Sequence, residues 1–298
     1  MNREMLLSVA LVAVAWAAPA LLLLTGLLRH RSRRGTRRWD WQVVVVSTLF
    51  CTAAFNLTFL LQEFFLVLPK AFVPGLKPVL YHNDHSWAGT APVAELFEGT
   101  GAVAIVAIAL AFSIAAKGKN RSLARLFALW MTFEGLFQGL PQFVLGAMLP
   151  GNDVGRAYAY LHIGGVGRSL LACLALLAVP ATGIWIGRYA LSFADSAAAV
   201  EDWRARTRTI AEILALPALA AIPLIIPFRV PREAVEVVLL PLLVQLMGAG
   251  WVLAAAWPRR TPSVHGLPSS RPVIGAAVLV AGLLAVFQLV LRPGIRFY

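Results

Sequence analysis

Long apolar runs separated by short polar segments make up most of this chain of 298 residues. A run of about 20 predominantly apolar residues is long enough for a helix to cross the hydrocarbon core of a bilayer. The runs occupy residues 5–28, 42–68, 99–116, 126–149, 157–187, 209–228, 234–257 and 272–291. They predict eight transmembrane helices. The expected fold is therefore an all-α, polytopic helical bundle in a membrane.

The composition supports a membrane location for the whole chain. Hydrophobic residues make up 59% of it, charged residues only 13%, and the mean hydropathy is +0.76. Such a chain is far more apolar than a soluble domain, and helices satisfy the backbone hydrogen bonds that lipid cannot. We expect a single transmembrane domain over residues 1–298. The run at 209–228 is the least secure span, because Pro217, Pro223 and Pro227 interrupt it.

Basic residues concentrate in alternate polar segments, which predicts the orientation of the bundle. The basic segments are RHRSRRGTRR, KGKNRSLAR, WRARTR and PRRTPSVHGLPSSR. All four fall on one side, and the excess of Lys and Arg on cytoplasmic loops makes that side the cytoplasm. Both termini and the 69–98 loop would then lie outside a plasma membrane of the bacterial inner-membrane type. Residues 188–208 are expected to form a cytoplasmic interfacial segment. The net charge of +12 follows this topology and does not indicate nucleic acid.

Two carboxylates lie inside predicted spans. Glu63 is a little over one helical turn from the outer end of the second span, and Glu134 lies nearer the middle of the fourth. Gln138 and Gln142 follow Glu134 at intervals of four, so the three share one helix face. An ionisable group costs several kcal/mol inside a bilayer, so we expect Glu63 and Glu134 to face each other inside the bundle and to have catalytic roles. Asn56 and Gln142 have the more ordinary explanation of hydrogen bonds between helices.

Three histidines are expected on the outer side. His82 and His85 belong to the segment LYHNDHSWAG, and their spacing puts them on one face if that segment turns helically. His162 follows the outer PGND turn, where Asp153 is a candidate helix N-cap. Three imidazoles and an open position are typical of catalytic zinc, whereas two histidines and a carboxylate suit non-haem iron. The alternative is that the histidines only hydrogen-bond within a folded loop, with partners such as Asp84.

The leading functional hypothesis is a metal-dependent hydrolase acting at the outer face on a lipid or lipid-linked substrate. We expect the 69–98 loop to fold back and deliver His82 and His85 to His162. The metal would polarise a water, Glu63 would accept its proton, and Glu134 would orient the substrate. Residues expected to bind substrate are Lys70, Lys77, Gln138 and Tyr158, the lysines because they can hold an anionic head group.

Three alternatives remain open from the sequence. One is a proton-coupled transporter in which Glu63 and Glu134 exchange protons. Another is a non-haem iron enzyme, and the third is a haem-binding membrane subunit, although there is no CxxCH attachment site. The cofactor expected for the leading hypothesis is a divalent metal, with zinc favoured and iron as the alternative. Glu95 and Glu98 are expected to support the ligating imidazoles as outer carboxylates.

Overall fold

The computed structural model describes residues 3–30, 39–118, 121–258, 263–269 and 272–298. Within that part of the chain, seven helices are long and apolar enough to cross a membrane. They confirm the all-α membrane bundle, and the chain is an integral membrane protein whose outer helical surfaces contact lipid. These spans are Glu4–Arg29, Trp41–Phe72, Ala94–Ala116, Gly165–Leu191, Trp203–Arg229, Val235–Ala254 and Val273–Leu291.

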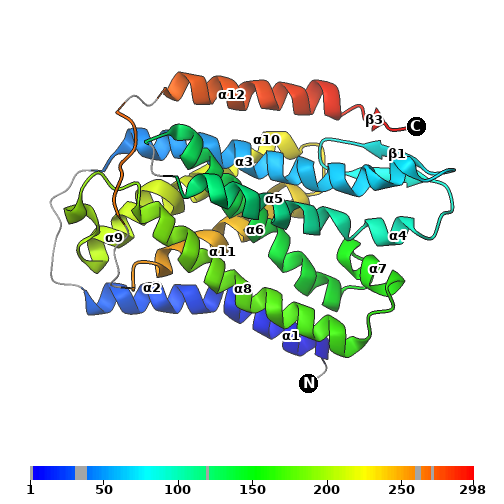
Figure 1. The fold of residues 1–298 in the computed structure, drawn as a ribbon, viewed down its shortest axis with the longest axis horizontal. Coiled ribbons are helices and arrows are strands. Elements are labelled where there is room, and N and C mark those ends of the chain that lie inside the picture. Colours follow the sequence, from blue (N-terminus) through cyan, green and yellow to red (C-terminus); the bar gives the residue numbers. More distant parts are fainter. Residues whose placement is uncertain (1–2, 31–38, 119–120, 259–262, 270–271) are drawn as a thin grey trace.

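Several of the spans are built from more than one helical segment, joined end to end (Figure 1). The four π-helical stretches, η1, η4, η5 and η6, each continue directly into or out of an α-helix. The segments are α1 (Arg3–Val12), η1 (Ala13–Ala17), α2 (Ala18–Arg29), α3 (Trp41–Val67), η2 (Pro69–Phe72), α4 (Ala94–Phe97), α5 (Thr100–Ala116), α8 (Gly165–Leu191), α9 (Trp203–Ile210), η4 (Ala211–Ala215), α10 (Leu216–Arg229), η5 (Val235–Leu239), α11 (Leu240–Ala254), α12 (Val273–Ala285) and η6 (Val286–Leu291).

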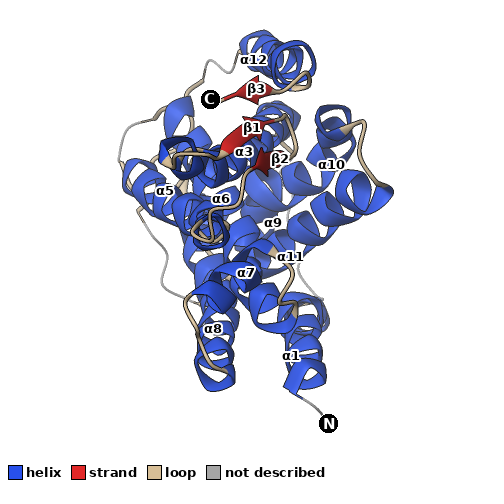
Figure 2. Cartoon of the chain, turned by 90° about the vertical axis from the view of Figure 1, so that its right-hand side faces the viewer, coloured by secondary structure: helices blue, strands red, loops and turns tan. Residues whose placement is uncertain are grey.

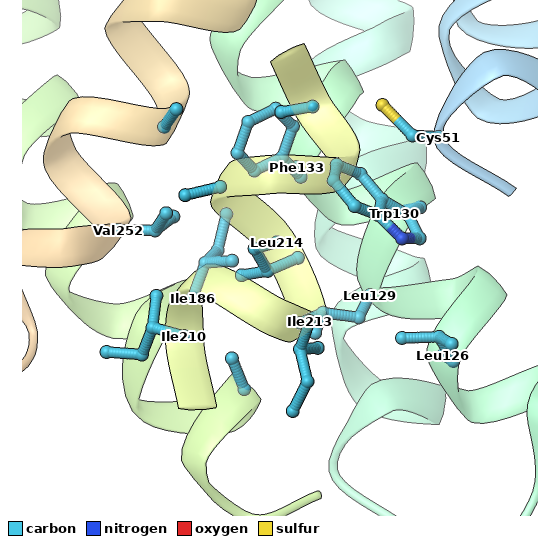
Figure 3. Packing of buried hydrophobic residues seen from close by; sticks show 14 of the residues in the cluster. Cys51, Leu126, Leu129, Trp130, Phe133, Ile186, Ile210, Ile213, Leu214 and Val252 are labelled. Atoms are coloured by element: carbon cyan, nitrogen blue, oxygen red, sulfur yellow. The ribbon is translucent and has the colours of Figure 1, made fainter. Parts of the chain in front are cut away.

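The remaining long helix, α6 (Leu123–Met148), packs against α3, α5 and α8 and corresponds to the fourth predicted span. The Ser122 side chain starts it by accepting a hydrogen bond from the backbone N–H of Ala124, at 3.1 Å. Aromatic side chains such as Trp130 and Phe133 are fully buried, as Figure 3 shows. Because protein surrounds α6, this helix can carry more polar side chains than the lipid-facing spans.

Small residues let α5 and α6 approach closely. A Cβ on Gly135 would lie 2.6 Å from the Cβ of Ala109 and 2.7 Å from the carbonyl oxygen of Ile105. A Cβ on Gly139, one turn further along α6, would lie 2.6 Å from Cγ2 of Val106. Glycines four apart at a helix contact are a common way to pack helices in membranes. They hold α6, with its polar stripe, against the helix that follows the outer loop.

The structure corrects two predicted segments. The fifth span does not run from residue 157: α7 (Asp153–Tyr160) is a separate helix, and α8 starts after a turn in which His162 has a φ of 52°. Asn152, not Asp153, caps α7, because its side chain accepts from the backbone N–H of Gly155. Residues 188–208 are not one interfacial segment either. They contain the end of α8, a 3₁₀ turn η3 (Ala197–Val200), and α9, which is the start of the sixth span.

The 69–98 loop is structured, as predicted, and it contains a small antiparallel sheet. Strand β1 (Lys77–Leu80) pairs with β2 (His85–Ala88) on one side and with β3 (Ile295–Arg296) on the other, in the order β2-β1-β3. Figure 2 shows this sheet beside the ends of α3 and α10. Gly75 and Gly89 have φ angles of 86° and 114°, a region that glycine enters without strain. The second histidine of LYHNDHSWAG is thus in a strand rather than a helix.

The start of α1 and the C-terminus lie at the end of the bundle that holds the sheet and α7 (Figure 1). The C-terminus is fixed there because β3 pairs with β1. We refer to this end, defined by β1, β2, α4 and α7, as the sheet end. Its assignment to the outside of the cell stays a prediction from the basic segments, of which WRARTR is fully described and belongs to α9, at the opposite end (Figure 1).

Candidate functional site

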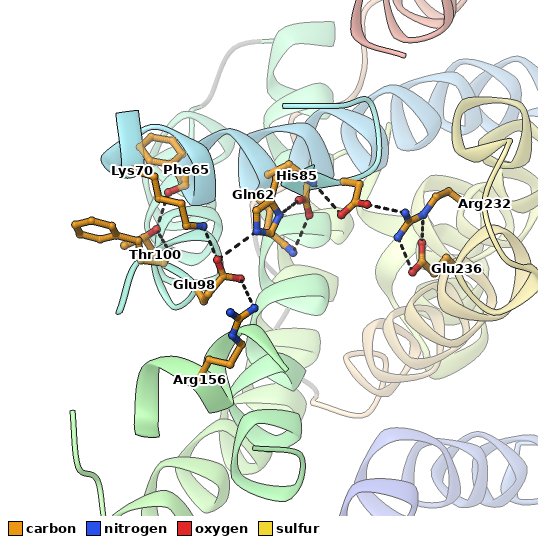
Figure 4. A network of polar contacts seen from close by, with 12 residues as sticks. Gln62, Phe65, Lys70, His85, Glu98, Thr100, Arg156, Arg232 and Glu236 are labelled. Atoms are coloured by element: carbon orange, nitrogen blue, oxygen red, sulfur yellow. Dashed lines mark hydrogen bonds and ion pairs between the residues drawn. The ribbon is translucent and has the colours of Figure 1, made fainter. Parts of the chain in front are cut away.

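The sheet end buries a charged group built around His85. Its Nδ1 lies 2.8 Å from Oε2 of Glu63, which is on α3, and its Nε2 lies 3.3 Å from Oε1 of Glu98, between α4 and α5 (Figure 4). His85 is at the start of β2, so pairing of β2 with β1 fixes the position of its ring over α3. Both ring nitrogens therefore face carboxylates, which is the arrangement of a protonated imidazole.

The charge state of His85 follows from those two contacts. Burial lowers the pKa of His85, but the hydrogen bonds that it donates to Glu63 and Glu98, together with their negative charges, outweigh that effect. The result is a pKa of about 9. His85 is accordingly an imidazolium at neutral pH, held between two carboxylates.

Glu98 is the centre of a wider network. It forms a buried ion pair with Lys70, and the Lys70 ammonium also lies 4.2 Å from the centre of the Trp87 ring. Arg156 of α7 approaches the second carboxylate oxygen of Glu98 at 3.9 Å and makes a bidentate pair with Glu95. Three separate elements, η2, β2 and α7, thus meet at one carboxylate.

The two lysines predicted to bind a head group have different environments. Lys70 is fully buried and does not present its charge at the surface, and its role in binding substrate stays a prediction. Its burial is tolerated because the ammonium is paired with Glu98. Lys77 is exposed, with its Nζ 5.7 Å from the centre of the Tyr298 ring. Its role as a substrate-binding residue stays a prediction.

Asp153 adds a titratable group beside this network. Burial raises the pKa of Asp153, and the negative charges of Glu98 and Glu63 raise it further, to about 7. The positive charge of His85 acts in the opposite direction. At the sheet end, Asp153 therefore loses its proton near neutral pH, whereas His85 keeps its proton there.

Asp84 joins the network from the β1–β2 turn. Its Oδ1 accepts a hydrogen bond from the backbone N–H of His85 at 2.8 Å, and its Oδ2 lies 2.7 Å from Nη1 of Arg232. Arg232 in turn is paired with Glu236, as Figure 4 shows. One ligand atom each from Glu63, Asp84 and His85 lies within 4.8 Å of the others, so these residues form a candidate metal group.

The structure does not bring the three predicted metal ligands together. His85 belongs to the group above, but Nε2 of His82 is instead 3.2 Å from the carbonyl oxygen of Val230, and His82 is buried. His162 is exposed in the turn between α7 and α8. The expectation failed because it took the spacing of His82 and His85 as helical, whereas a turn and a strand send the two rings in different directions.

Glu134 is fully buried and lies on α6, away from the histidines. Its Oε1 accepts hydrogen bonds from the Gln245 amide at 2.8 Å and the Cys51 thiol at 3.3 Å. Its Oε2 accepts from the Gln138 amide at 3.1 Å, as the four-residue spacing predicts. The partnerships with Cys51 and Gln245 were missed, since nothing in the local sequence of α3 or α11 points to them.

Glutamines connect this buried carboxylate to the sheet end. The side-chain amide of Gln142 donates to the backbone carbonyl oxygen of Gln138 at 3.1 Å, not to its side chain, and to Oε1 of Gln62 at 2.6 Å. Gln62 donates to Oε1 of its neighbour Glu63 at 3.4 Å. Glu63 and Glu134 are both buried, as predicted, but each has its own partners and the polar chain lies between them. We call this connection, Glu134–Gln138–Gln142–Gln62–Glu63–His85, the polar chain.

Two further buried atoms are relevant to the predicted site. Thr58 Oγ1 and Gln138 Oε1, on the helices that carry the polar chain, have no hydrogen-bond partner among the described residues.

Tyr158, predicted to bind substrate, is buried with Leu7 and Val154 in a small apolar cluster, and its hydroxyl has no hydrogen-bond partner among the described residues. Its role as a substrate-binding residue stays a prediction.

Comparison of the chain with models of known protein families, with curated proteins and with solved structures finds no match. The function must therefore be argued from the site.

Proposed function

We propose that this protein is a proton-coupled membrane carrier in which Glu134 and Glu63 take up and release protons from the sheet end. The observation that carries the proposal is the polar chain, which links a fully buried carboxylate to a carboxylate–imidazolium pair at the end of the bundle. Buried ionisable groups inside a membrane bundle are characteristic of proton relays in pumps and transporters.

The chemistry of the polar chain fits a hydrated path. Carboxylates and imidazoles accept and release protons, whereas glutamine amides keep the path polar and form hydrogen bonds with water. The unpaired acceptors Thr58 Oγ1 and Gln138 Oε1 are the places where bound water would be stabilised, because a buried acceptor without a partner costs free energy. In this proposal, water at those atoms carries protons between Glu63 and Glu134.

At the opposite end, a cavity of about 10 Å³ reaches Ile213, and Asp40 and Glu212 also line it. The Ile213 carbonyl oxygen accepts a hydrogen bond from Ser47, which in turn accepts one from Trp130. Ser47 lies one helical turn before Cys51, and apolar side chains such as Leu214 fill that level of the bundle (Figure 3). Among the described residues, no hydrogen bond links Ser47 to Cys51 or Glu134, which suits a carrier that is closed on this side.

Proton flux through reconstituted protein tests this proposal. The purified protein is reconstituted in vesicles that contain a pH-sensitive dye, and a potassium diffusion potential is imposed. The luminal pH of these vesicles should change faster than that of protein-free vesicles. Glu134→Gln should abolish the difference, because an amide keeps the shape of the side chain but cannot exchange its proton. Gln62→Leu should slow the flux by breaking the connection.

Asn56→Ala is the matched control. Asn56 is buried on α3 but donates only to the Thr52 carbonyl of its own helix, so its loss should leave the flux unchanged. A wild-type flux equal to that of Glu134→Gln would contradict the proposal, provided that both proteins are folded and equally reconstituted.

The predicted metal-dependent hydrolase is a second candidate, and the observation that favours it is the group Glu63, Asp84 and His85. Zinc is the favoured metal and iron the alternative; either would activate a water for hydrolysis when bound. His85 would first have to lose its ring proton, because both nitrogens face carboxylates. For this reason we place the hydrolase below the carrier.

Metal content separates the two candidates. Elemental analysis of detergent-purified protein should find roughly one zinc or iron per chain if the group binds metal, and His85→Ala should lose it. His162→Ala is the control, since His162 is exposed and outside the group. Metal-free wild-type protein would rule out the hydrolase and leave the carrier proposal standing.

A further inference from the structure

Arg229 ends α10 with a charge that is poorly neutralised. The side chain is 1% exposed, and its Nε donates to the backbone carbonyl of Glu236 at 2.7 Å. Its guanidinium lies 4.1 Å from the centre of the Phe59 ring and 6.0 Å from that of Phe55. Nη1 is buried and has no hydrogen-bond partner among the described residues. Aromatic contacts offset part of the cost of burying this cation, but they satisfy none of its N–H groups.

The β1–β2 turn lies directly over the end of α10. Asn83 donates to the Arg229 carbonyl at 2.7 Å, and Nε2 of His82 is 3.2 Å from the carbonyl of Val230. Both side chains are buried, yet Nδ1 of His82 and Oδ1 of Asn83 have no partner in the described part of the chain. Gln288 of η6 donates to the same Val230 carbonyl. Among the described residues, the end of α10 and the turn that covers it thus carry three buried polar atoms without a hydrogen-bond partner.

Three arginines bring positive charge to this point, while Glu236 and Glu63 act on Arg229 without an ion pair to it in the described part of the chain. Burial lowers the pKa of His82, and the positive charges of Arg292, Arg232 and Arg229 lower it further despite the contact with Val230. Arg292 is exposed at the end of η6 and donates only a long 3.4 Å hydrogen bond to Gln288, while Arg232 is already paired with Asp84 and Glu236. An anion passing Arg292 would thus find a deeper cation with free donors.

We infer that Arg229 and His82 form a binding site for a phosphate group, with Arg229 Nη1 and His82 Nδ1 as its direct contacts. A guanidinium binds phosphate oxygens with parallel hydrogen bonds, and an aromatic ring beneath it leaves that edge available. Binding would place a negative charge against the unpaired edge of Arg229. Nε2 of a neutral His82 donates to the Val230 carbonyl, so its Nδ1 would accept a hydrogen bond from a protonated phosphate oxygen. A hydroxyl of the ligand, as on glycerol or on a phosphate monoester, would satisfy Asn83 Oδ1.

The location of the site admits a lipid. Large apolar side chains around its edge are exposed, among them Val230 at 43% and Leu289 at 75%. The site lies at the sheet end of a membrane span, at the level where lipid head groups meet the protein. The phosphate could therefore come from a phospholipid head group or from a free phosphate ester. This inference uses none of the atoms in the polar chain, so it stands or falls independently of the carrier proposal.

Binding to the full-length protein in phosphatidylcholine nanodiscs tests the site. One arm adds inorganic phosphate, and the other replaces part of the phosphatidylcholine with phosphatidylglycerol; the readout in each is the thermal unfolding temperature from tryptophan fluorescence. A ligand that binds the folded state raises this temperature. Arg229→Gln should weaken the interaction by about 10-fold or more, the effect of losing a charged hydrogen bond.

His82→Phe provides a second variant in case Arg229→Gln does not fold. It should weaken binding of whichever addition, inorganic phosphate or phosphatidylglycerol, raises the unfolding temperature of the wild type. Arg168→Gln is the matched control. Arg168 is also an arginine at the sheet end, on α8, but its Nε donates to the backbone carbonyl of Ile163, away from the proposed site. A response to both additions identifies a general phosphate site, and a response to phosphatidylglycerol alone identifies a lipid head-group site. No response in either arm, or an equal response in wild type and in the Arg229 and His82 variants, would overturn the inference.

Discussion

At the scale of single residues, the protonation of His85 decides the charge balance of the sheet end. Glu63 and Glu98 are both nearly inaccessible, and without a positive imidazole the two carboxylates would lack one of their counter-charges. A buried charge left without its partner is strongly destabilising. His85 is therefore expected to stabilise the fold as an imidazolium rather than as a neutral ring.

This role predicts a defined pH dependence. The folded pKa of His85 is about 9 and the unfolded value is 6.5, so its contribution is complete below pH 6.5 and is lost as the pH rises through 9. The difference corresponds to about 3 kcal/mol. Unfolding with a denaturing detergent, followed by tryptophan fluorescence, should show that His85→Gln destabilises the protein much more at pH 7 than at pH 9.5.

His82→Gln is the comparison for that experiment. The pKa of His82 is lowered, so its protonation changes below pH 6.5 and its effect on stability should be constant between pH 6.5 and 9.5. If the two variants showed the same pH profile, His85 would not be an imidazolium in the folded protein.

The sequence identified some residues of the site and missed others for a physical reason. Glu63 and Glu134 could be found because a carboxylate inside an apolar run is expensive, and both are buried as expected. Cys51, Gln245 and Arg229 give no such signal. Their importance comes from partners more than 80 residues away for Cys51 and Gln245, and from the fold of the β1–β2 turn for Arg229.

At the scale of elements, Glu98 joins the sheet to the helices. It sits between α4 and α5 and contacts Lys70 of η2 and His85 of β2. Thr100, two residues later, donates to carbonyl oxygens of Phe65 and Phe97, which ties the start of α5 to α3 (Figure 4). A two-stranded hairpin is only marginally stable by itself, so these contacts are needed to hold β1 and β2 in place.

Glu98→Gln should therefore loosen the hairpin. Breaking a buried ion pair by removing one partner costs roughly 3–5 kcal/mol, and here the cost falls on contacts that hold β2. Hydrogen–deuterium exchange with mass spectrometry should show faster exchange over residues 77–88. Glu95→Gln, which breaks a partly exposed pair with Arg156, should change exchange there little. Equal effects of the two substitutions would contradict the anchoring role of Glu98.

The ends of a helix could be predicted where a long apolar run forms it, but not where a short turn inside such a run ends it. The span at 42–68 matches α3 closely, and the span at 272–291 matches α12 with η6, since their ends coincide with charged or proline-containing segments. The break between α7 and α8 was missed, because it is made by a left-handed residue, His162, inside an otherwise apolar run. The β1–β2 sheet was missed because its third strand comes from the far C-terminus.

At the scale of the whole molecule, the helices differ in how much of each is covered by protein. α6 is largely buried against its neighbours, whereas the span Val273–Leu291 has only 11% of its most apolar window buried. The polar chain follows the same division: Glu134 and the glutamines of that chain are on the covered helices α3 and α6, whereas Gln288, which is not part of it, lies on η6 of the less covered span. A sequence reading finds the spans but does not distinguish central from peripheral ones, because both are apolar and helical.

The orientation of the bundle is the remaining whole-molecule prediction, and it decides on which side of the membrane the candidate site works. Lys77 is exposed at the sheet end, and Lys117 is exposed at the end of α5, on the opposite side of the bundle. In a Cys173→Ser background, in which Cys51 is buried and protected, Lys77→Cys should react with a membrane-impermeant maleimide on intact cells. Lys117→Cys should react only after lysis, because its end of the bundle carries the basic segments that stay in the cytoplasm. The reverse labelling pattern would place His85, the polar chain and the Arg229 site on the cytoplasmic side, and protons would then enter the polar chain from the cytoplasm.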